Sequence, residues 1–362
     1  MNKNILLIIM ALWCQVALGQ RIQVVDTDGL PIPYVCVTNT RGALVGTTDE
    51  EGWLENTRGE KELYFSHIAF QATNVLADTV TNARVVMKDV DFGLGEVTVK
   101  PKELAYIQTY YRLIYLDDEG PIYFRGGVID NTYEFAKKKS SSKKRNLSRG
   151  ENGLIRFLIS SLVGRYIDKL GQVTDESTYK KVLTAAKAGT VSVEGDSLGR
   201  QTVSDSISVL GYIDTDMEAG MRTTSFNMWA YHDHQEEAKL RAKGKEKKKK
   251  ADRNREESFY EVYRIDEQGR SRIDDFVMRQ MHVSADHSKT VGRYVILLQA
   301  YTTARDYIDK KEFKQTRKEN EVEMNIRELR QFEEAHNIPP LPANVKAAVD
   351  KLFEKELGKK EN

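Results

Sequence analysis

One short segment carries the residue types that nucleophilic catalysis needs. Residues 195–199 read G-D-S-L-G and fit the pattern G-x-S-x-G. In that pattern a sharp turn after a strand exposes the serine hydroxyl, and a histidine accepts its proton. Residues 190–194 could form the strand, but the chain after Ser197 continues with β-type residues and opens no helix. Ser197 is therefore a candidate nucleophile, and a plain hairpin turn is the alternative, because Gly, Asp and Ser favour turns.

The sequence G-D-S-L also resembles the nucleophile block of the GDSL lipases. Enzymes of that family carry the serine near the N-terminus and an Asp-x-x-His block near the C-terminus. This chain contains no Asp-x-x-His sequence. The resemblance therefore stops at one short block, and a serine hydrolase that uses Ser197 is kept as an alternative function.

Two histidines form a candidate metal site. His232 and His234 are separated by one residue, so on a strand that includes residues 225–232 they would face the same side. Zinc would need a further ligand, which His282 or His287 could supply. The alternative is a polar strand end that leads into a basic segment. The sequence predicts no cofactor.

Three tripeptides resemble the D-[ST]-[apolar] acceptor of O-glycosylation in cell envelopes. They are residues 78–80 (D-T-V), 196–198 (D-S-L) and 205–207 (D-S-I). A motif this short arises easily by chance, so its presence agrees with export of the chain and does not establish it.

The first residues predict a cleavable secretory signal. Lys3 supplies the positive charge, residues 5–13 are an uninterrupted apolar run, and residues 17–19 (A-L-G) form a small-x-small cleavage site. The run is shorter than the roughly 20 residues of a spanning helix. A buried helix or an uncleaved anchor is the alternative. We expect residues 1–19 to be removed, and the mature chain to be periplasmic or outer-membrane associated without a transmembrane segment.

Charge and cysteine content narrow the remaining classes. The chain has 55 basic and 54 acidic residues, a balance that argues against a nucleic-acid partner. Residues 20–99 contain 6 basic and 12 acidic side chains, so the remainder of the mature chain is basic, which suggests two domains. Cys36 is the only cysteine after the signal, so no intrachain disulfide can form and the core must hold the fold.

Residues 20–99 have an all-β pattern. Short apolar segments at 22–25, 34–38, 63–70 and 84–87 alternate with turns rich in Asp and Gly, a spacing that predicts a β-sandwich. Three stretches in this order, V-V-D-x-D-G-x-P-I-P-Y-V-x-V, G-T-T-D-E-E-G-W and L-Y-F-S-H-I-A-F, resemble the carboxypeptidase regulatory-like (transthyretin-like) domain. That resemblance implies a non-catalytic antiparallel sandwich common in secreted and envelope proteins, and it does not imply peptidase activity.

Residues 100–362 predict an α+β region with an antiparallel sheet and several helices, so that the whole chain is mainly β with α. Apolar residues recur at helical spacing in 153–170, and residues 175–188 and the end of the chain after Pro342 predict further helices. The predicted strands of an antiparallel meander are 258–265, 274–283 and 291–302. Residues 110–112 (Y-Y-R) and 338–342 (I-P-P-L-P) resemble segments of uncharacterised envelope proteins, from which no activity follows.

Two basic runs interrupt this region. Residues 137–149 contain seven positive side chains and no acidic one, and residues 239–255 contain ten against Glu246 and Asp252. Both runs predict solvated loops or frayed helices. Contact with an anionic lipid or polysaccharide is the functional alternative.

Three functions remain open. The first is a non-catalytic exported envelope protein that binds or scaffolds through residues 100–362, with an envelope protein, glycan or lipid as its partner. The second is the hydrolase that uses Ser197. The third is a carrier of an apolar ligand in a curved antiparallel sheet covered by helices. The sequence favours the first and leaves enzyme activity uncertain.

Cleavage of the signal can be tested directly. We expect the native protein to begin at Gln20, because the small-x-small site ends at Gly19. N-terminal sequencing of protein purified from its own cells checks this. Recovery of Met1 on that protein would contradict both the cleavage and the expected location.

Overall fold

The computed structural model describes residues 21–55, 57, 59–77, 80, 84–90, 104–150, 177–244, 255–287, 292–311 and 323–354. The predicted signal peptide 1–19, the predicted helix 153–170 and most of the basic run 239–255 lie outside these residues.

The N-terminal domain, residues 21–90, consists of two small sheets. One has the order β4-β1-β7 and the other β3-β2-β5-β6. All pairings are antiparallel except that of β1 with β7, which is parallel. The domain is all-β, as the turn spacing predicted, but the parallel pair β1–β7 departs from the wholly antiparallel sandwich that was expected. Its strands are β1 (Ile22–Val25), β2 (Cys36–Thr38), β3 (Leu44–Thr47), β4 (Trp53–Leu54), β5 (Glu62–His67), β6 (Phe70–Leu76) and β7 (Arg84–Val86).

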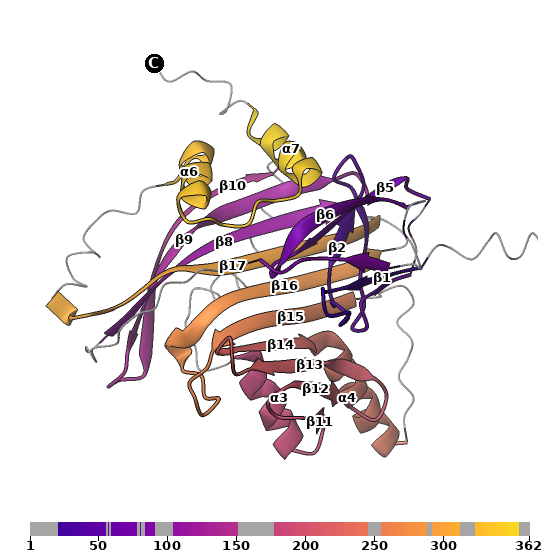
Figure 1. Ribbon diagram of the computed structural model, residues 1–362, viewed down its shortest axis with the longest axis vertical. Coiled ribbons are helices and arrows are strands. Elements are labelled where there is room, and N and C mark those ends of the chain that lie inside the picture. Colours follow the sequence, from indigo (N-terminus) through magenta and orange to yellow (C-terminus); the bar gives the residue numbers. More distant parts are fainter. Residues whose placement is uncertain are drawn as a thin grey trace, which may run out of the picture.

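A ten-stranded antiparallel sheet forms the centre of the molecule (Figure 1). Its spatial order is β10-β9-β8-β17-β16-β15-β14-β13-β12-β11, so the first and last strands of the region pair in its interior. Its strands are β8 (Leu104–Asp117), β9 (Pro121–Glu134), β10 (Lys139–Gly150), β11 (Ser192–Gly195), β12 (Arg200–Ser204), β13 (Val209–Asp216), β14 (Met221–Asn227), β15 (Arg255–Arg264), β16 (Phe276–His287) and β17 (Gly292–Ile308).

The structure corrects the expectation of a loop at residues 137–149. The chain turns at residues 135–138 and then forms β10, which pairs with β9 over its full length and lies at an edge of the sheet. The run was mistaken for a loop because its apolar content is low. An edge strand has one open side and tolerates lysines there, which protect the edge from unwanted pairing.

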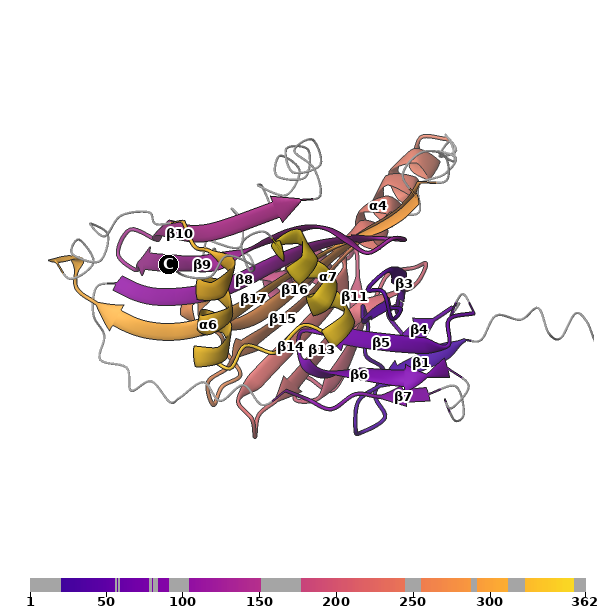
Figure 2. The ribbon, with the colours of Figure 1, turned by 90° about the horizontal axis from the view of Figure 1, so that it is seen from above.

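Helices cover both faces of the sheet. Helices α3 (Thr178–Lys187) and α4 (Met228–Ala242) lie at the end formed by β11 to β14, where their apolar side chains share a cluster with Val203, Ile213 and Phe226 (Figure 1). Helices α6 (Ile326–Ala335) and α7 (Ala343–Leu352) lie with the N-terminal domain on the other face (Figure 2). No helix in the described part of the chain is both long and apolar enough to cross a membrane.

Close contact between α6 and the sheet depends on a glycine in β9. A Cβ atom at Gly126 would lie 2.8 Å from Leu329 Cδ2, which is closer than real contacts allow. The missing side chain therefore admits the buried Leu329 of α6 to the surface of the sheet.

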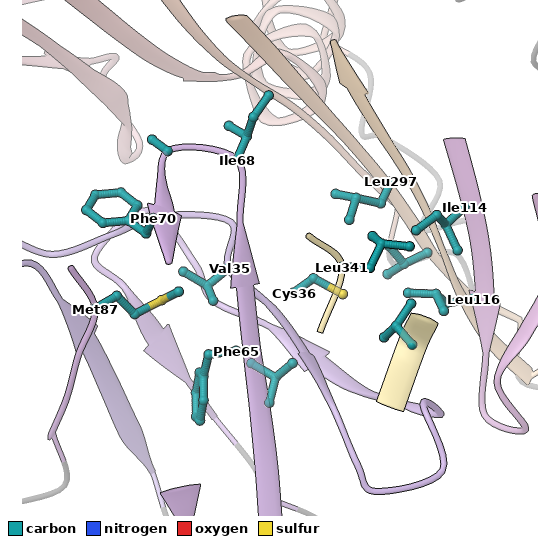
Figure 3. Close-up of a cluster of buried hydrophobic side chains, with 14 of the residues drawn as sticks. Val35, Cys36, Phe65, Ile68, Phe70, Met87, Ile114, Leu116, Leu297 and Leu341 are labelled. Carbon is teal, nitrogen blue, oxygen red and sulfur yellow. The ribbon is translucent and has the colours of Figure 1, made fainter. Parts of the chain in front are cut away.

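One hydrophobic cluster joins the N-terminal domain, the large sheet and the C-terminal helices. Figure 3 shows Val35 and Phe65 of the domain in the same cluster as Leu341 and as Ile114 and Leu297 of the sheet. Burial of a large apolar side chain contributes about 1.5–3 kcal/mol, so a shared cluster links the stability of the three parts.

We expect the domain and the sheet to unfold together. Trp53 lies in β4 and Trp229 in α4, so Trp229→Phe and Trp53→Phe variants of residues 20–362 each leave one fluorescent reporter. A shared core predicts that the two fluorescence transitions have the same denaturant midpoint. Circular dichroism measures the stability of each variant, so that any effect of the substitution itself can be subtracted first. A Trp53 transition at clearly lower denaturant would show that the domain unfolds by itself.

Candidate functional site

A row of buried polar side chains crosses the face of the sheet on which the N-terminal domain lies. Arg112 of β8 is directly opposite Gln299 of β17, and Gln299 is directly opposite Gln280 of β16. Arg112, Gln299 and Gln280 are 3%, 2% and 1% exposed, respectively. Buried polar groups are costly unless they are hydrogen-bonded, so the partners of this row decide what it does. We call this row and its partners the junction.

Gln280 connects the sheet to the N-terminal domain. Its Oε1 accepts from the backbone N–H of Ile68 at 3.1 Å, and its Nε2 donates to the carbonyl of Tyr34 at 3.2 Å. Neither backbone group lies inside a strand, since Ile68 is in the turn after β5 and Tyr34 has φ of 60°. Gln280 therefore satisfies domain groups that have no ladder partner, and Gln299 Nε2 donates to the same Oε1 at 2.9 Å.

Arg112 connects the sheet to the C-terminal segment. Its Nη1 donates to the carbonyl of Pro339 at 2.8 Å, and its Nε donates to Gln299 Oε1 at 2.7 Å. Its Nη2 donates to Tyr301 Oη at 3.3 Å. The Y-Y-R and I-P-P-L-P segments that stood out in the sequence thus meet at this guanidinium.

A second set of polar contacts continues from the sheet through both C-terminal helices. Tyr110 Oη donates to Glu333 of α6. Arg330 donates from Nη1 to Glu333 Oε2 at 2.8 Å and from Nη2 to Asp350 of α7 at 2.9 Å. Burial opposes the charge of Arg112, but the nearby tyrosines and Glu333 outweigh it, and its pKa is raised. The cation is therefore retained inside the fold.

The N-terminal domain is also held at its acidic turn. Asn227 Nδ2 donates to Glu50 Oε1 at 2.5 Å, while Asn227 Oδ1 accepts from the N–H of Ala230 at 2.9 Å. One amide thus binds the domain and caps α4, as asparagine does at helix N-termini. Burial raises the pKa of Glu50, although the hydrogen bond from Asn227 opposes this shift.

Two further side chains bind the domain from other directions. Arg200 of β12 donates to the carbonyl of Pro31 at 3.4 Å and lies over the ring of Tyr212 at 4.0 Å. Asn344 of α7 donates to the carbonyl of Asn39 at 2.7 Å and to Thr38 Oγ1 at 2.8 Å. The domain is therefore also fixed by a strand near one edge of the large sheet and by the C-terminal helix α7.

Two buried histidines lie where the domain and the sheet meet. His282 of β16 shares a 2.9 Å hydrogen bond between its Nε2 and Thr47 Oγ1 of the domain. His67 of β5 packs edge-on against Tyr260 with ring centroids 4.5 Å apart. Burial lowers the pKa of His282 to about 4 and that of His67 to about 3, so both rings are neutral near pH 7.

Ser197 lies in the hairpin turn between β11 and β12. Its side chain is exposed, and the turn is closed by hydrogen bonds from Leu198 N to Asp196 Oδ1 at 3.0 Å and from Gly199 N to the Asp196 carbonyl at 3.1 Å. Among the described residues, no hydrogen bond joins Ser197 to a histidine. The structure thus places Ser197 in a turn between two strands and not before a helix.

The structure corrects the expected strand at residues 225–232. Strand β14 ends at Asn227, whose side chain caps α4, so His232 and His234 lie on a helix. Residues two apart on a helix point to different sides, so the pair cannot share a metal ion as it would on a strand. His234 Nδ1 instead contacts Asp205 Oδ2 at 2.7 Å. Within the described ranges, no group of three or more His, Cys, Asp or Glu side chains is arranged to hold a metal.

The residues of the junction were not identified as a site from the sequence. Arg112, Gln280 and Gln299 are far apart in the chain, and only the register of the sheet brings them together. Residues 110–112 and 338–342 stood out in the sequence, and both contribute to the junction. No local sequence pattern reveals that these two segments are in contact. No protein-family model matches the chain, and no curated protein matches it.

Acidification is expected to weaken the junction through His282. Its pKa is about 4 in the fold and about 6.5 in the unfolded chain, so the unfolded state binds more protons between these values. Stability contributed by the neutral ring is complete above pH 6.5 and is lost as the pH falls toward 4, by about 3 kcal/mol at most.

Chemical denaturation at pH 7, 6, 5 and 4 measures this loss. His282→Gln keeps an amide that can bond Thr47 and cannot titrate, so its free energy of unfolding should fall less steeply than that of the wild type. Carboxyls such as Glu50 contribute equally to both proteins and cancel in the comparison. Parallel curves for the two proteins would contradict the assignment.

Proposed function

We propose that this chain is a non-catalytic, exported binding protein of the cell envelope, in which residues 20–99 are a carboxypeptidase regulatory-like domain. The two-sheet arrangement of that domain supports the family resemblance, and the predicted signal 1–19 supports export. Charged side chains that could take part in catalysis, such as Arg112 and Glu333, instead form hydrogen bonds between the sheet and the C-terminal segment. We therefore assign the chain a binding role.

The basic edge strand carries this proposal. Within the described residues the large sheet ends at β10. The turn before it presents Lys137 and Lys138, and the strand begins with Lys139; all three are exposed. Lys143 and Arg145 follow on the strand, on the face that carries α7. An open strand edge with a cluster of lysines suits an anionic partner, because attraction at a surface adds about 1 kcal/mol for each basic residue near it.

Charge reversal at the turn tests this role. We expect the Lys138→Glu/Lys139→Glu variant to bind isolated envelope material about tenfold more weakly than the wild type in co-sedimentation at low salt. The matched control is Lys180→Glu/Lys187→Glu, which makes the same charge change on exposed positions of α3. Equal loss in both variants, or binding that is insensitive to salt, would contradict a specific basic edge.

A second candidate function is favoured by the opposite face of the sheet. Tyr111, Tyr123, Tyr263, Phe276 and Met281 belong to an apolar cluster there, and aromatic and methionine side chains adapt to apolar ligands. A carrier of such a ligand would retain it through purification. Native mass spectrometry of protein from its own envelope, with solvent extraction, would reveal a bound lipid, and its absence would leave the binding role as the better assignment.

A further inference from the structure

Two hairpin turns of the large sheet present the same chemical pattern. Asp196-Ser197-Leu198 joins β11 to β12, and Asp205-Ser206-Ile207 joins β12 to β13. In each turn the aspartate Oδ1 accepts from the backbone N–H two residues later, at 3.0 Å for Leu198 and 2.8 Å for Ile207. Both serine side chains are exposed. Each turn therefore holds a carboxylate, a hydroxyl and an apolar side chain in one fixed order.

The apolar residue of each turn has no evident structural use. Leu198 is 63% exposed and Ile207 is 51% exposed, which places both among the few large apolar side chains that the described residues leave in solvent. Single exposed apolar side chains are common on protein surfaces, so what distinguishes these two is their identical position after Asp-Ser in an exposed turn. A transferase that reads a short segment would use such a side chain as its anchor.

We propose that Ser197 and Ser206 are O-glycosylation sites. In the reaction the serine oxygen attacks the anomeric carbon of a sugar whose anomeric oxygen is bonded to a diphosphate. The new C–O bond forms as the bond between the anomeric carbon and its diphosphate oxygen breaks. The diphosphate leaves with that oxygen and the electron pair, and the hydroxyl proton passes to a base of the transferase. The co-reactants are thus an activated glycosyl donor and a glycosyltransferase.

Electrostatics favour a sugar over a phosphoryl group at these positions. Glycosyl transfer passes through a state that resembles an oxocarbenium cation, which a neighbouring carboxylate stabilises. The same carboxylate repels an incoming phosphoryl donor. Partial burial opposes ionisation of Asp205, but amide hydrogen bonds from Ser208 and Ile207 and the contact with His234 outweigh it, and its pKa is lowered. The carboxylate is therefore charged beside Ser206.

The chain contains its own control for turn geometry. Asp26-Thr27-Asp28 forms the same turn, with Asp26 Oδ1 accepting from Asp28 N at 2.9 Å, and Thr27 is exposed. Its third residue is acidic where Ser197 and Ser206 are followed by Leu198 and Ile207. If an accessible hydroxyl in such a turn were sufficient for glycosylation, Thr27 would be glycosylated too. If glycosylation also requires the apolar residue that follows, Thr27 remains unmodified. Ser208 is a second control, because it is exposed in the same turn as Ser206 but does not follow an aspartate.

The experiment is peptide and intact-mass spectrometry of the full chain purified from the cells that make it. We expect a glycan of the same mass on Ser197 and on Ser206, and none on Thr27 or Ser208. Ser197→Ala and Ser206→Ala should each remove one glycan, Ser208→Ala should remove none, and Leu198→Asp should abolish the glycan on Ser197 while circular dichroism shows an unchanged fold.

Three results would overturn the proposal. They are unmodified peptides at both serines, a phosphate in place of a glycan, and equal modification of Thr27. The proposal rests on the export proposed above, which the N-terminal sequence of the same purified protein tests separately. None of these outcomes bears on the basic edge strand.

Discussion

A buried guanidinium holds the three parts of this molecule in one arrangement. Arg112 lies in the interior of the large sheet, and its donors are divided between Gln299 of the sheet and the carbonyl of Pro339 in the C-terminal segment. Apolar packing provides most of the stabilisation but has no direction. The row of Arg112, Gln299 and Gln280 supplies direction, because each unmade hydrogen bond of a buried group costs about 1–3 kcal/mol and only one docking position satisfies all of them.

The rest of the architecture follows from that fixed docking. The N-terminal domain contacts the sheet through Gln280, contacts α4 through Asn227 and contacts α7 through Asn344. Asn227 also meets a local need, because it caps α4. The N-terminal domain and the C-terminal helices cover the centre of one face of the sheet. The edge strand β10 and the hairpin turns remain exposed to solvent. The exposed features available for recognition are therefore peripheral.

Local pattern was enough to predict several of the short strands and the helices α3 and α7. Strand β5, for example, alternates buried and partly buried residues along Glu62–His67, which is the period of a half-covered strand. Strands β8 and β9 were not anticipated, because residues such as Tyr110 and Tyr111 are buried on opposite faces and the apolar run loses its alternation. The histidines of α4 were misplaced because a single capping residue, Asn227, ends β14 and starts a helix. The junction depends on register between distant strands, which no local window contains.

The order of strands in the sheet has a consequence for how the chain acquires its structure. Strand β17 completes the sheet by pairing with β8, and the hydrogen bond between Arg112 and Gln299 joins residues 187 positions apart. Such long-range pairings delay folding, since a large loop must close before its contacts repay the lost entropy. Strand β8 consequently has no partner on the side away from β9 until β17 has been synthesised, when almost the whole chain is present. An unpaired strand edge is prone to aggregation, so the interval before β17 pairs with β8 is the stage at which this fold is most exposed to misassembly.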